Sequence, residues 1–300
     1  MRVLLSGSSG LVGSALLAWL GEQGAEVARI VRSNLGGGSD TIFWQPELGI
    51  LDPAQLEGFE LVIHLAGENL ASGRWTTARK RRIRDSRVVG TRLLSERLAS
   101  LSRPPKAFFC ASAIGFYGNR GDELLNEASQ PGAGFLAEVT QEWESATQAA
   151  ASKGIRVALL RFGIILSRNG GALAKMLLPF QLGFGGQVGR GDQYWSWIAI
   201  DDVIGAIEHI LEKESLHGPI NLVSPQPLTN LDFTRALGEA LHRPTFFAMP
   251  AFVARLALGE MAEETLLAST WVEPARLLAS GYRFRYQSLE ATLAHLIGRK

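Results

Sequence analysis

Short hydrophobic runs recur along the chain, and each has the pattern of a parallel strand that is buried on both faces. These runs are rich in β-branched or aromatic residues and occupy residues 3–5, 27–31, 61–65, 107–110, 157–160 and 220–223. Apolar residues with helical spacing lie between them, over residues 11–22, 79–100, 138–152 and 201–213. Strands that alternate with helices in this way form right-handed crossovers. The pattern therefore predicts an α/β fold, a Rossmann-type doubly wound parallel sheet with helices on both faces.

The pattern changes after Gly163. Glycines crowd the next stretch, which also carries Trp195 and Trp197, and this composition predicts a loop-rich segment that faces a ligand. These glycines are Gly170, Gly171, Gly183, Gly185, Gly186, Gly189 and Gly191. Further helices are predicted at residues 230–241, 250–258 and 263–268. We expect two parts: a Rossmann domain over residues 1–163, to which 201–224 return, and a smaller, mainly helical C-terminal lobe over 164–200 and 225–300.

The composition narrows the class of protein. With 300 residues, of which 46% are hydrophobic, the chain can bury a substantial core, which excludes a disordered protein. A net charge of +1 argues against nucleic-acid and membrane partners and favours a small-molecule substrate. The single cysteine cannot form an internal disulfide, and the chain opens on a strand-like run without a signal-peptide pattern. We therefore expect a cytoplasmic protein, and we predict no metal site.

A glycine-rich loop stands between the first strand and the first helix, in the setting of a dinucleotide-binding site. Its sequence is Ser6-Gly7-Ser8-Ser9-Gly10-Leu11-Val12-Gly13. Gly7 allows the tight turn, Gly10 lets the backbone approach a pyrophosphate, and Gly13 lets the helix pack close to the strand. The predicted cofactor-binding residues of this loop are Gly7, Ser9, Gly10, Leu11, Val12 and Gly13. A glycine-rich turn without a ligand is the alternative.

The end of the second strand bears on the choice of dinucleotide. An acid at this place binds the adenosine ribose of NAD, but here Arg32 and Ser33 follow the strand and the next acid is Asp40. A guanidinium suits the additional 2′-phosphate of NADP. We therefore predict NADP(H) in preference to NAD(H), with Arg32 and Ser33 at that phosphate. An exposed arginine without a ligand is the alternative.

The strand at 61–65 ends in small residues. Leu65, Ala66 and Gly67 allow a dinucleotide to lie across the strand ends without collision, so we predict that they contact the cofactor. His64 lies inside the apolar strand, so we expect a core histidine and not a catalytic one.

Together with the stretch 112–118 (SAIGFYG), the glycine loop and the strand end at 64–67 resemble the extended short-chain dehydrogenase/reductase superfamily. Within it, the chain is similar nearly end to end to the branch known as the epimerase family, or NAD-dependent epimerase/dehydratase. The similarity is carried by residues 64–69 (HLAGEN), 185–191 (GGQVGRG), 195–198 (WSWI) and 256–261 (LALGEM). The resemblance implies a helical C-terminal lobe, and the homodimers that relatives often form make a homodimer possible here.

The superfamily's proton relay, a tyrosine followed four residues later by a lysine, is missing. When Glu144 is aligned with the glutamate that often follows the lysine, Leu136 and Thr140 occupy the two positions. Leucine has no proton to give and threonine carries no charge. Arg87 also stands where relatives usually have a structural asparagine, a further departure from the usual relay.

Other candidate site residues come from the resemblance. Ser112 matches a substrate-binding hydroxyl that polarises a carbonyl and adjoins the cofactor, although a serine that satisfies a nearby backbone group is the alternative. Tyr117 matches a tyrosine outside the relay and is the second candidate catalytic residue. Gly163 and Ile164 are candidate contacts to the nicotinamide, whereas Arg161 is expected to be an ion-pair partner.

Two further patterns concern charged residues. Asp201 and Asp202 are expected at the start of a helix, where they can cap it. A basic run follows the Gly67 loop and is expected to be a solvated helix face, from which one or two residues can reach an anionic substrate. It consists of Arg74, Arg79, Lys80, Arg81, Arg82, Arg84 and Arg87.

Three functions fit these patterns. The first is an NADP(H)-dependent oxidoreductase that acts on an unknown small molecule, with Ser112 and a proton donor outside the usual pair. The second is a non-catalytic NADP(H)-binding sensor or regulator. The third is a nucleotide-sugar epimerase or dehydratase, which the absent tyrosine and lysine disfavour.

Overall fold

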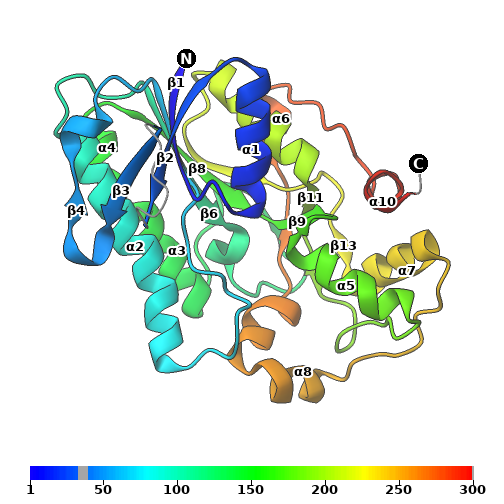
Figure 1. Ribbon diagram of the computed structural model, residues 1–300. Coiled ribbons are helices and arrows are strands. Elements are labelled where there is room, and N and C mark those ends of the chain that lie inside the picture. Colours follow the sequence, from blue (N-terminus) through cyan, green and yellow to red (C-terminus); the bar gives the residue numbers. More distant parts are fainter. Residues whose placement is uncertain (33–39, 299–300) are drawn as a thin grey trace.

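The computed structural model describes residues 1–32 and 40–298, and these residues form an eight-stranded sheet (Figure 1). The strands lie in the order β12-β8-β6-β5-β1-β2-β3-β4 and are parallel, except for the antiparallel pair β3–β4. They are β1 (Arg2–Ser6), β2 (Glu26–Val31), β3 (Thr41–Gln45), β4 (Ile50–Leu51), β5 (Leu61–His64), β6 (Ala107–Ala113), β8 (Arg156–Phe162) and β12 (Gly218–Leu222). The order reverses between β1 and β5, which is the Rossmann arrangement. The predicted fold class is confirmed, and the strands β3 and β4 are additions that the sequence patterns did not predict.

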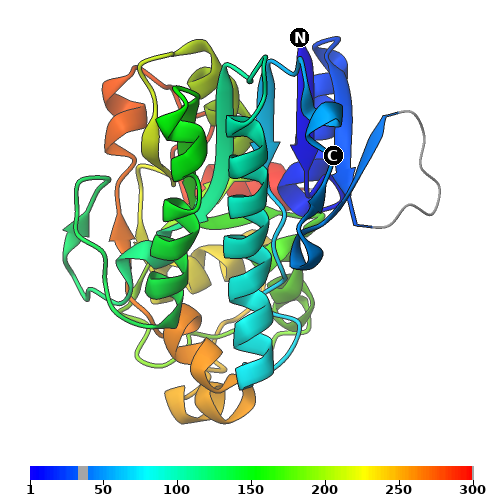
Figure 2. The same ribbon diagram turned by 90° about the vertical axis from the view of Figure 1, so that its left-hand side faces the viewer.

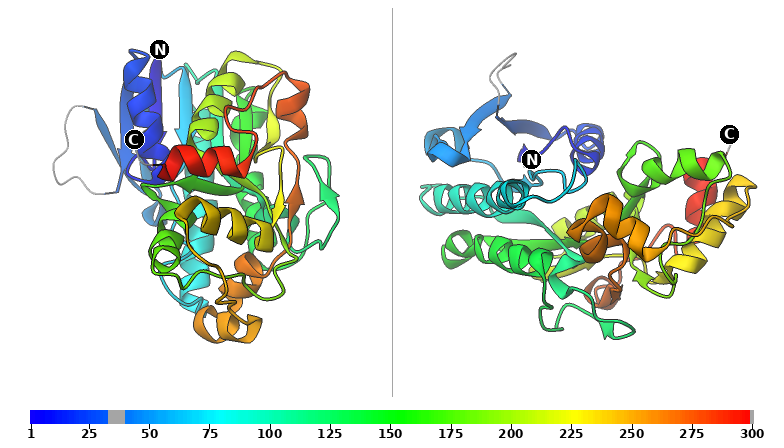
Figure 3. Two further views of the ribbon diagram at one scale, coloured as in Figure 1. Left: turned by 90° about the vertical axis from the view of Figure 1, so that its right-hand side faces the viewer. Right: turned by 90° about the horizontal axis from the view of Figure 1, so that it is seen from below.

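Helices cover both faces of the sheet (Figures 2 and 3). On one face, α1 (Leu11–Glu22) packs beside α6 (Ile200–Glu212) over a core that includes Leu16, Leu20 and Ile207. On the other face, α2 (Thr77–Ala99) packs against α3 (Phe135–Ser145) and α4 (Gln148–Ser152) over a second core. Because both faces are covered, the central strands are apolar along their whole length, as the continuous hydrophobic runs predict.

The predicted helix over residues 138–152 is in fact two helices. The chain leaves α3 after Ser145, where the Thr147 hydroxyl donates to the carbonyl of Glu144 at 2.7 Å, and it enters α4 at Gln148. A threonine hydroxyl that binds a carbonyl three residues back offers the backbone an alternative to the regular helix.

The segment over residues 164–200 combines loops with short elements: residues 182–193, which hold five of its seven clustered glycines, contain no helix or strand. This segment forms β9 (Ile164–Ser167), α5 (Gly171–Gln181), β10 (Tyr194–Trp195) and β11 (Trp197–Ala199). Its glycines surround these elements, while Trp195 and Trp197 are buried in a third core. Clustered glycines therefore mark both a long connection and close turns between short elements here.

The C-terminal part is mainly helical, as predicted. The helices are α7 (Asn230–Leu241), α8 (Ala251–Leu258), the π-helical turn η4 (Ala262–Leu266), α9 (Ala275–Ala279) and α10 (Leu289–Ile297), of which α9 and α10 were not predicted. α5, α7 and α10 pack together around the third core. Short elements complete the fold: η1 (Pro46–Leu48), η2 (Pro53–Leu56), η3 (Ile114–Tyr117), β7 (Leu124–Leu125), β13 (Leu228–Thr229) and β14 (Trp271–Val272).

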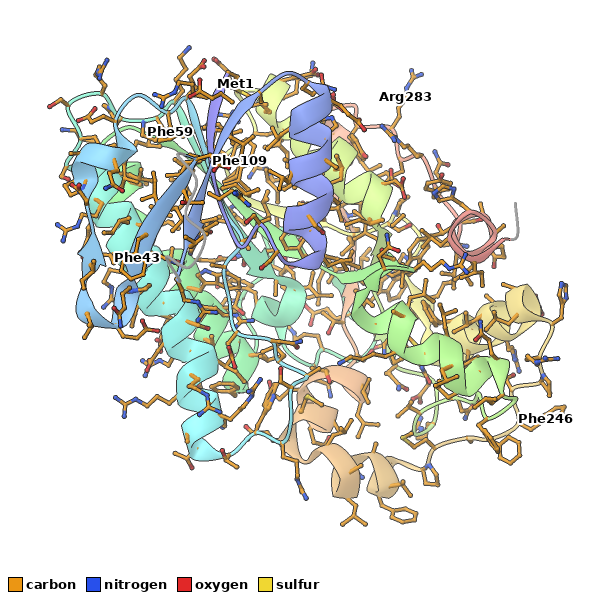
Figure 4. All side chains as sticks on the ribbon, viewed as in Figure 1. Met1, Phe43, Phe59, Phe109, Phe246 and Arg283 are labelled. Atoms are coloured by element: carbon orange, nitrogen blue, oxygen red, sulfur yellow. The ribbon has the colours of Figure 1, made fainter. Side chains whose placement is uncertain are left out.

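β12 belongs to the main sheet and α6 packs on it, although both follow residues 164–199 in the sequence. β12 pairs with β8 and α6 packs on α1, so the chain does return as expected, whereas the division into domains stays a prediction. Figure 4 places Phe109 inside the Rossmann part and Phe246 on the outside of the C-terminal lobe, where its side chain is 86% exposed. In the part of the chain that the structure describes, no helix is both long and apolar enough to cross a membrane.

Candidate functional site

The glycine loop after β1 builds a cradle from backbone alone. Gly7 adopts a φ of +70°, and a Cβ there would lie 2.7 Å from the carbonyl carbon of Leu65. A Cβ on Gly13 would lie 2.1 Å from the carbonyl oxygen of Gly7, so α1 touches the loop at a distance that only glycine permits. Both glycines therefore have the roles that the sequence predicts for them in the fold.

The start of α1 leaves hydrogen-bond donors free. Gly10 precedes the helix in an extended conformation, and no side chain caps it. Within the described residues, the backbone N–H groups of Leu11, Val12 and Gly13 have no acceptor, as the first turn of an uncapped helix requires. Free N–H groups and the helix dipole together favour an anion at this place.

A cavity of about 310 Å³ opens at the carboxyl ends of the strands, beside this loop. Its lining residues are Gly7, Gly10, Leu11, Val12, Gly13, Leu65, Leu70, Arg87, Ala111, Ser112, Ala113, Gly115, Leu136, Val139, Thr140, Trp143 and Phe162. The structure thus brings the glycine loop and Ser112 together, although they are about a hundred residues apart in the sequence. The carboxyl edge of such a sheet, at the reversal of strand order, is where ligands bind in this fold.

A buried neutral pair supports the loop end of the cavity. The Ser6 hydroxyl accepts the N–H of Leu65 at 3.1 Å and lies 2.6 Å from Nδ1 of His64. Because it accepts from the backbone, its own O–H is free to donate to the imidazole. Burial lowers the pKa of His64 to about 4, so the ring is neutral at physiological pH. The expectation of a core histidine is met.

Ser112 is the centre of a second buried network. Its hydroxyl donates to Oε1 of Glu144 at 2.5 Å, and Glu144 makes a bidentate ion pair with Arg161 at 2.7 and 2.8 Å. Burial alone lowers the pKa of Arg161, but the hydrogen bonds and charge of Glu144 outweigh burial and raise it. Arg161 is therefore an ion-pair partner, as expected. The Ser112 O–H already donates its hydrogen bond to Glu144. The hydroxyl can therefore accept a hydrogen bond in the cavity, but it cannot polarise a carbonyl in this arrangement.

Tyr117 lies behind the cavity wall and not on it. Its side chain is completely buried, its O–H donates to Asn221 at 2.8 Å, and it accepts from Arg161 at 2.9 Å. Burial raises the pKa of the phenol in spite of the neighbouring guanidinium. A general acid at neutral pH needs a lowered pKa and access to the substrate, so the geometry gives no support to a catalytic Tyr117.

The two positions that replace the tyrosine and lysine both face the cavity. Leu136 and Thr140 line it from α3, so the alignment through Glu144 places the correct face of the helix at the site. The Thr140 hydroxyl donates to the carbonyl of Leu136 at 2.7 Å. Neither side chain offers a proton to a ligand, in agreement with the prediction.

Several other residues that were predicted to bind the cofactor do not line the cavity. Arg32 is exposed just beyond β2, and Ser33 lies outside the described residues. Ser9, Ala66 and Gly67 lie at the loop and strand ends but do not line the cavity.

Gly163 and Ile164 are also absent from the lining. Their backbone N–H groups donate to Leu222 and Ser196, at 3.1 and 2.9 Å, and β9 pairs with β11. Their predicted contact with the nicotinamide stays a prediction, whereas the preceding residue, Phe162, does line the cavity.

Four residues of the basic run form ion pairs from α2, and Arg79 among them is buried. Arg79 pairs with Glu68 at 3.1 Å, Lys80 with Glu260 at 2.7 Å, and Arg84 with Glu142 at 2.6 Å. Arg87 differs, because its side chain lines the cavity and stacks over the ring of Trp143.

Asp201 and Asp202 lie in the first turn of α6, as expected, but Asp202 does not cap the helix. Ala199 precedes the helix without a side-chain cap. The buried carboxylate of Asp202 instead accepts the N–H groups of Arg285 and Tyr286, at 2.7 and 3.1 Å, and ties the C-terminal segment to α6. Burial raises its pKa.

Sequence reasoning missed the apolar wall of the cavity. Leu70, Val139, Trp143 and Phe162 line it from a loop, from α3 and from β8. Their helical or strand spacing alone predicts core residues, so no local signal distinguishes them from the rest of the interior.

The parallel sheet, the uncapped helix behind a glycine loop, and the cavity at the strand reversal define a dinucleotide-binding protein of the Rossmann type. The chain belongs to the NAD dependent epimerase/dehydratase family, whose model matches residues 3–222. A domain of unknown function, DUF1731, matches residues 249–296. The recognition made from the sequence is confirmed.

Relatives cover nearly the whole chain. It is 39% identical to an epimerase family protein of Mycobacterium bovis, over 99% of this chain and 98% of the relative. The crystal structure of human epimerase family protein SDR39U1, determined with NADPH, superposes with a TM-score of 0.91 at 33% identity and covers 99% of both chains. A nucleoside-diphosphate sugar epimerase from Corynebacterium glutamicum gives a TM-score of 0.82 at 37% identity, over 99% of this chain and 58% of that one.

Proposed function

We propose that this protein binds NADP(H) and is an oxidoreductase of the short-chain dehydrogenase/reductase type that acts on a small molecule. The observation that carries the proposal is the cradle at the start of α1, where Gly7 and Gly13 leave no room for a side chain and the helix N–H groups face the cavity. The NADPH in the structure of human SDR39U1 supports this choice of cofactor.

The residues present fit the dinucleotide. The N–H groups of Leu11, Val12 and Gly13 would bind its diphosphate, because they are free and lie at the positive end of the helix dipole. Arg32 would bind the 2′-phosphate, since its guanidinium is exposed at the end of β2. The bound cofactor would supply or accept a hydride.

This chain's own residues would mainly orient the reactants. Ser112 is held by Glu144 and can accept one hydrogen bond from a ligand group. Leu136, Val139 and Phe162 give the cavity an apolar wall that excludes water. The hydroxyls of Thr140 and Ser112 both donate hydrogen bonds to acceptors within the protein. Solvent would therefore be the source of the proton in the reaction.

A non-catalytic sensor is the second candidate, and the same hydrogen bonds favour it. No side chain at the positions of the relay can pass a proton, while the diphosphate cradle is complete. Purified protein incubated with NADPH and a set of carbonyl compounds separates the two functions, with NADPH oxidation followed at its absorbance band. Turnover supports the oxidoreductase, and binding without any turnover supports the sensor. Turnover that persists in Ser112→Ala would contradict the role of Ser112.

The choice of NADP(H) is tested with Arg32→Asp. We expect NADPH affinity to fall by about 1.5 to 3 kcal/mol, the value of a charge-assisted contact, while NADH affinity stays close to that of the unchanged protein. The measurement is a fluorescence titration with each dinucleotide. Arg92→Asp is the matched control, because Arg92 is an exposed arginine of α2 that does not line the cavity. Equal weakening of NADPH and NADH would refute the assignment of Arg32.

A further inference from the structure

Arg87 has an unusual environment for a charged side chain. It comes from the middle of α2 and lines the cavity, and burial lowers the pKa of its guanidinium to about 10, so the group is charged at neutral pH. Among the described residues, no carboxylate oxygen lies within 4 Å of it. The nearby Glu68 is paired with Arg79 instead. A partly buried cation that makes no ion pair among the described residues is costly, and an anionic ligand would offset that cost.

The guanidinium also has donors to offer. Nη1 donates to the carbonyl of Ile83 at 3.0 Å and Nη2 donates to that of Glu68 at 3.1 Å. An arginine has five N–H donors, so three are left after these two bonds. The stack over Trp143 and the two carbonyls hold the group in one orientation.

The other polar side chains of the cavity have no proton left for a ligand. Ser112 donates to Glu144, Thr140 donates to Leu136, and the indole N–H of Trp143 donates to Thr91 at 2.9 Å. Of the polar side chains that line the cavity, Arg87 is therefore the one that keeps free donors. It also carries the positive charge that is missing from α3, where threonine stands in place of lysine.

Arg87 and Arg32 lie at different places along the carboxyl edge of the sheet. A Cβ on Gly67 would lie 3.5 Å from the Arg87 guanidinium carbon, so the group lies against the segment that follows β5. β5 lies between β1, which carries the glycine loop, and β6, which carries Ser112. Arg32, in contrast, lies at the end of β2 on the far side of β1.

We infer that Arg87 is a cofactor-binding residue that takes a phosphate oxygen of the dinucleotide's diphosphate, opposite the N–H groups of α1. The inference rests on the proposed function. In this arrangement α2 supplies a fixed positive charge to the site through Arg87. Arg87 would bind the diphosphate, whereas Arg32 would bind the 2′-phosphate of the same ligand.

The test compares two ligands in one pair of variants. NADPH carries the diphosphate, whereas adenosine 2′-monophosphate carries only the phosphate assigned to Arg32. In Arg87→Met, we expect NADPH affinity to fall by roughly 10- to 150-fold, as for a lost hydrogen bond to a charged group. The affinity for adenosine 2′-monophosphate, measured by NMR titration, should remain within about twofold. Arg82→Met, which removes an exposed charge from the same helix, should change neither affinity.

Each outcome has a definite meaning. If the unchanged protein does not bind NADPH, the proposed function fails. If it binds NADPH and Arg87→Met binds it equally well, or if both ligands weaken together, the inference about Arg87 fails while the proposed function stands. Arg87→Gln keeps a donor for the carbonyls of α2 and the loop, so it replaces Arg87→Met if that variant does not fold. Unchanged NADPH affinity in Arg87→Gln likewise overturns the inference.

Discussion

The two ends of the cavity rest on buried polar groups at equivalent places in the sheet. Under the glycine loop, Ser6 pairs in register with His64 on the neighbouring strand. Under the other end, Ser112 pairs in register with Arg161. Both sets of side chains stand at the carboxyl ends of adjacent parallel strands.

The chemistry of the two supports is different. Ser6 and His64 form a neutral pair, because burial keeps the imidazole uncharged. Ser112 instead donates a hydrogen bond to Glu144, which is ion-paired with Arg161. Arg161 also donates a hydrogen bond to Tyr117. A neutral pair can be buried at small cost but is sensitive to pH, whereas a buried ion pair is costly to break by removal of one partner.

The largest effect is expected from breaking the ion pair. Arg161→Met leaves the Glu144 carboxylate without its partner, and we expect a loss of about 3 to 5 kcal/mol in the free energy of unfolding. Denaturant unfolding measures this loss. The double variant Arg161→Met with Glu144→Leu removes both charges and should recover most of it. A double variant as unstable as the single one would show that the charges are not the cause.

A pH-dependent effect of about 3 kcal/mol is expected at the neutral pair. The pKa of His64 is about 4 in the folded protein and 6.5 ordinarily, so the unfolded chain binds the proton more tightly. His64 therefore contributes stability that is fully present above pH 6.5 and is lost as the pH falls toward 4. Unfolding curves over this range should show a steeper loss for the unchanged protein than for His64→Asn. Parallel curves would mean that His64 does not titrate in this way.

A smaller loss of stability, about 1 to 3 kcal/mol, is expected from Gly13→Val, together with loss of NADPH binding. The new Cβ would meet the carbonyl oxygen of Gly7, so the loop or helix must shift. Gly21→Ala is the control on the same helix, because nothing lies within 4 Å of its Cβ position. That change should stabilise the protein by about 0.5 to 1 kcal/mol. NADPH binding by Gly13→Val at full affinity would contradict the backbone cradle.

Much of the fold was predictable because its signals are local. The run of buried strands, the bounds of α1 and α7, and the glycine loop each depend on residues within about ten positions of one another. The same is true of the missing relay, since Leu136 and Thr140 lie on one helix. α5 was missed because its apolar side chains meet α7 and α10, which come much later in the sequence.

From the sequence alone follow the class of the fold, the glycine loop at the start of α1 and the absence of the usual tyrosine and lysine. Those features follow from backbone conformation and hydrophobic periodicity, which neighbouring residues set. The tertiary structure was needed to show that the Ser112 hydroxyl donates to Glu144, that Tyr117 is enclosed, and that Arg87 lines the cavity and makes no ion pair among the described residues. These facts depend on contacts between strands and helices far apart in the chain, where burial and hydrogen-bond partners decide which charge remains available to a ligand.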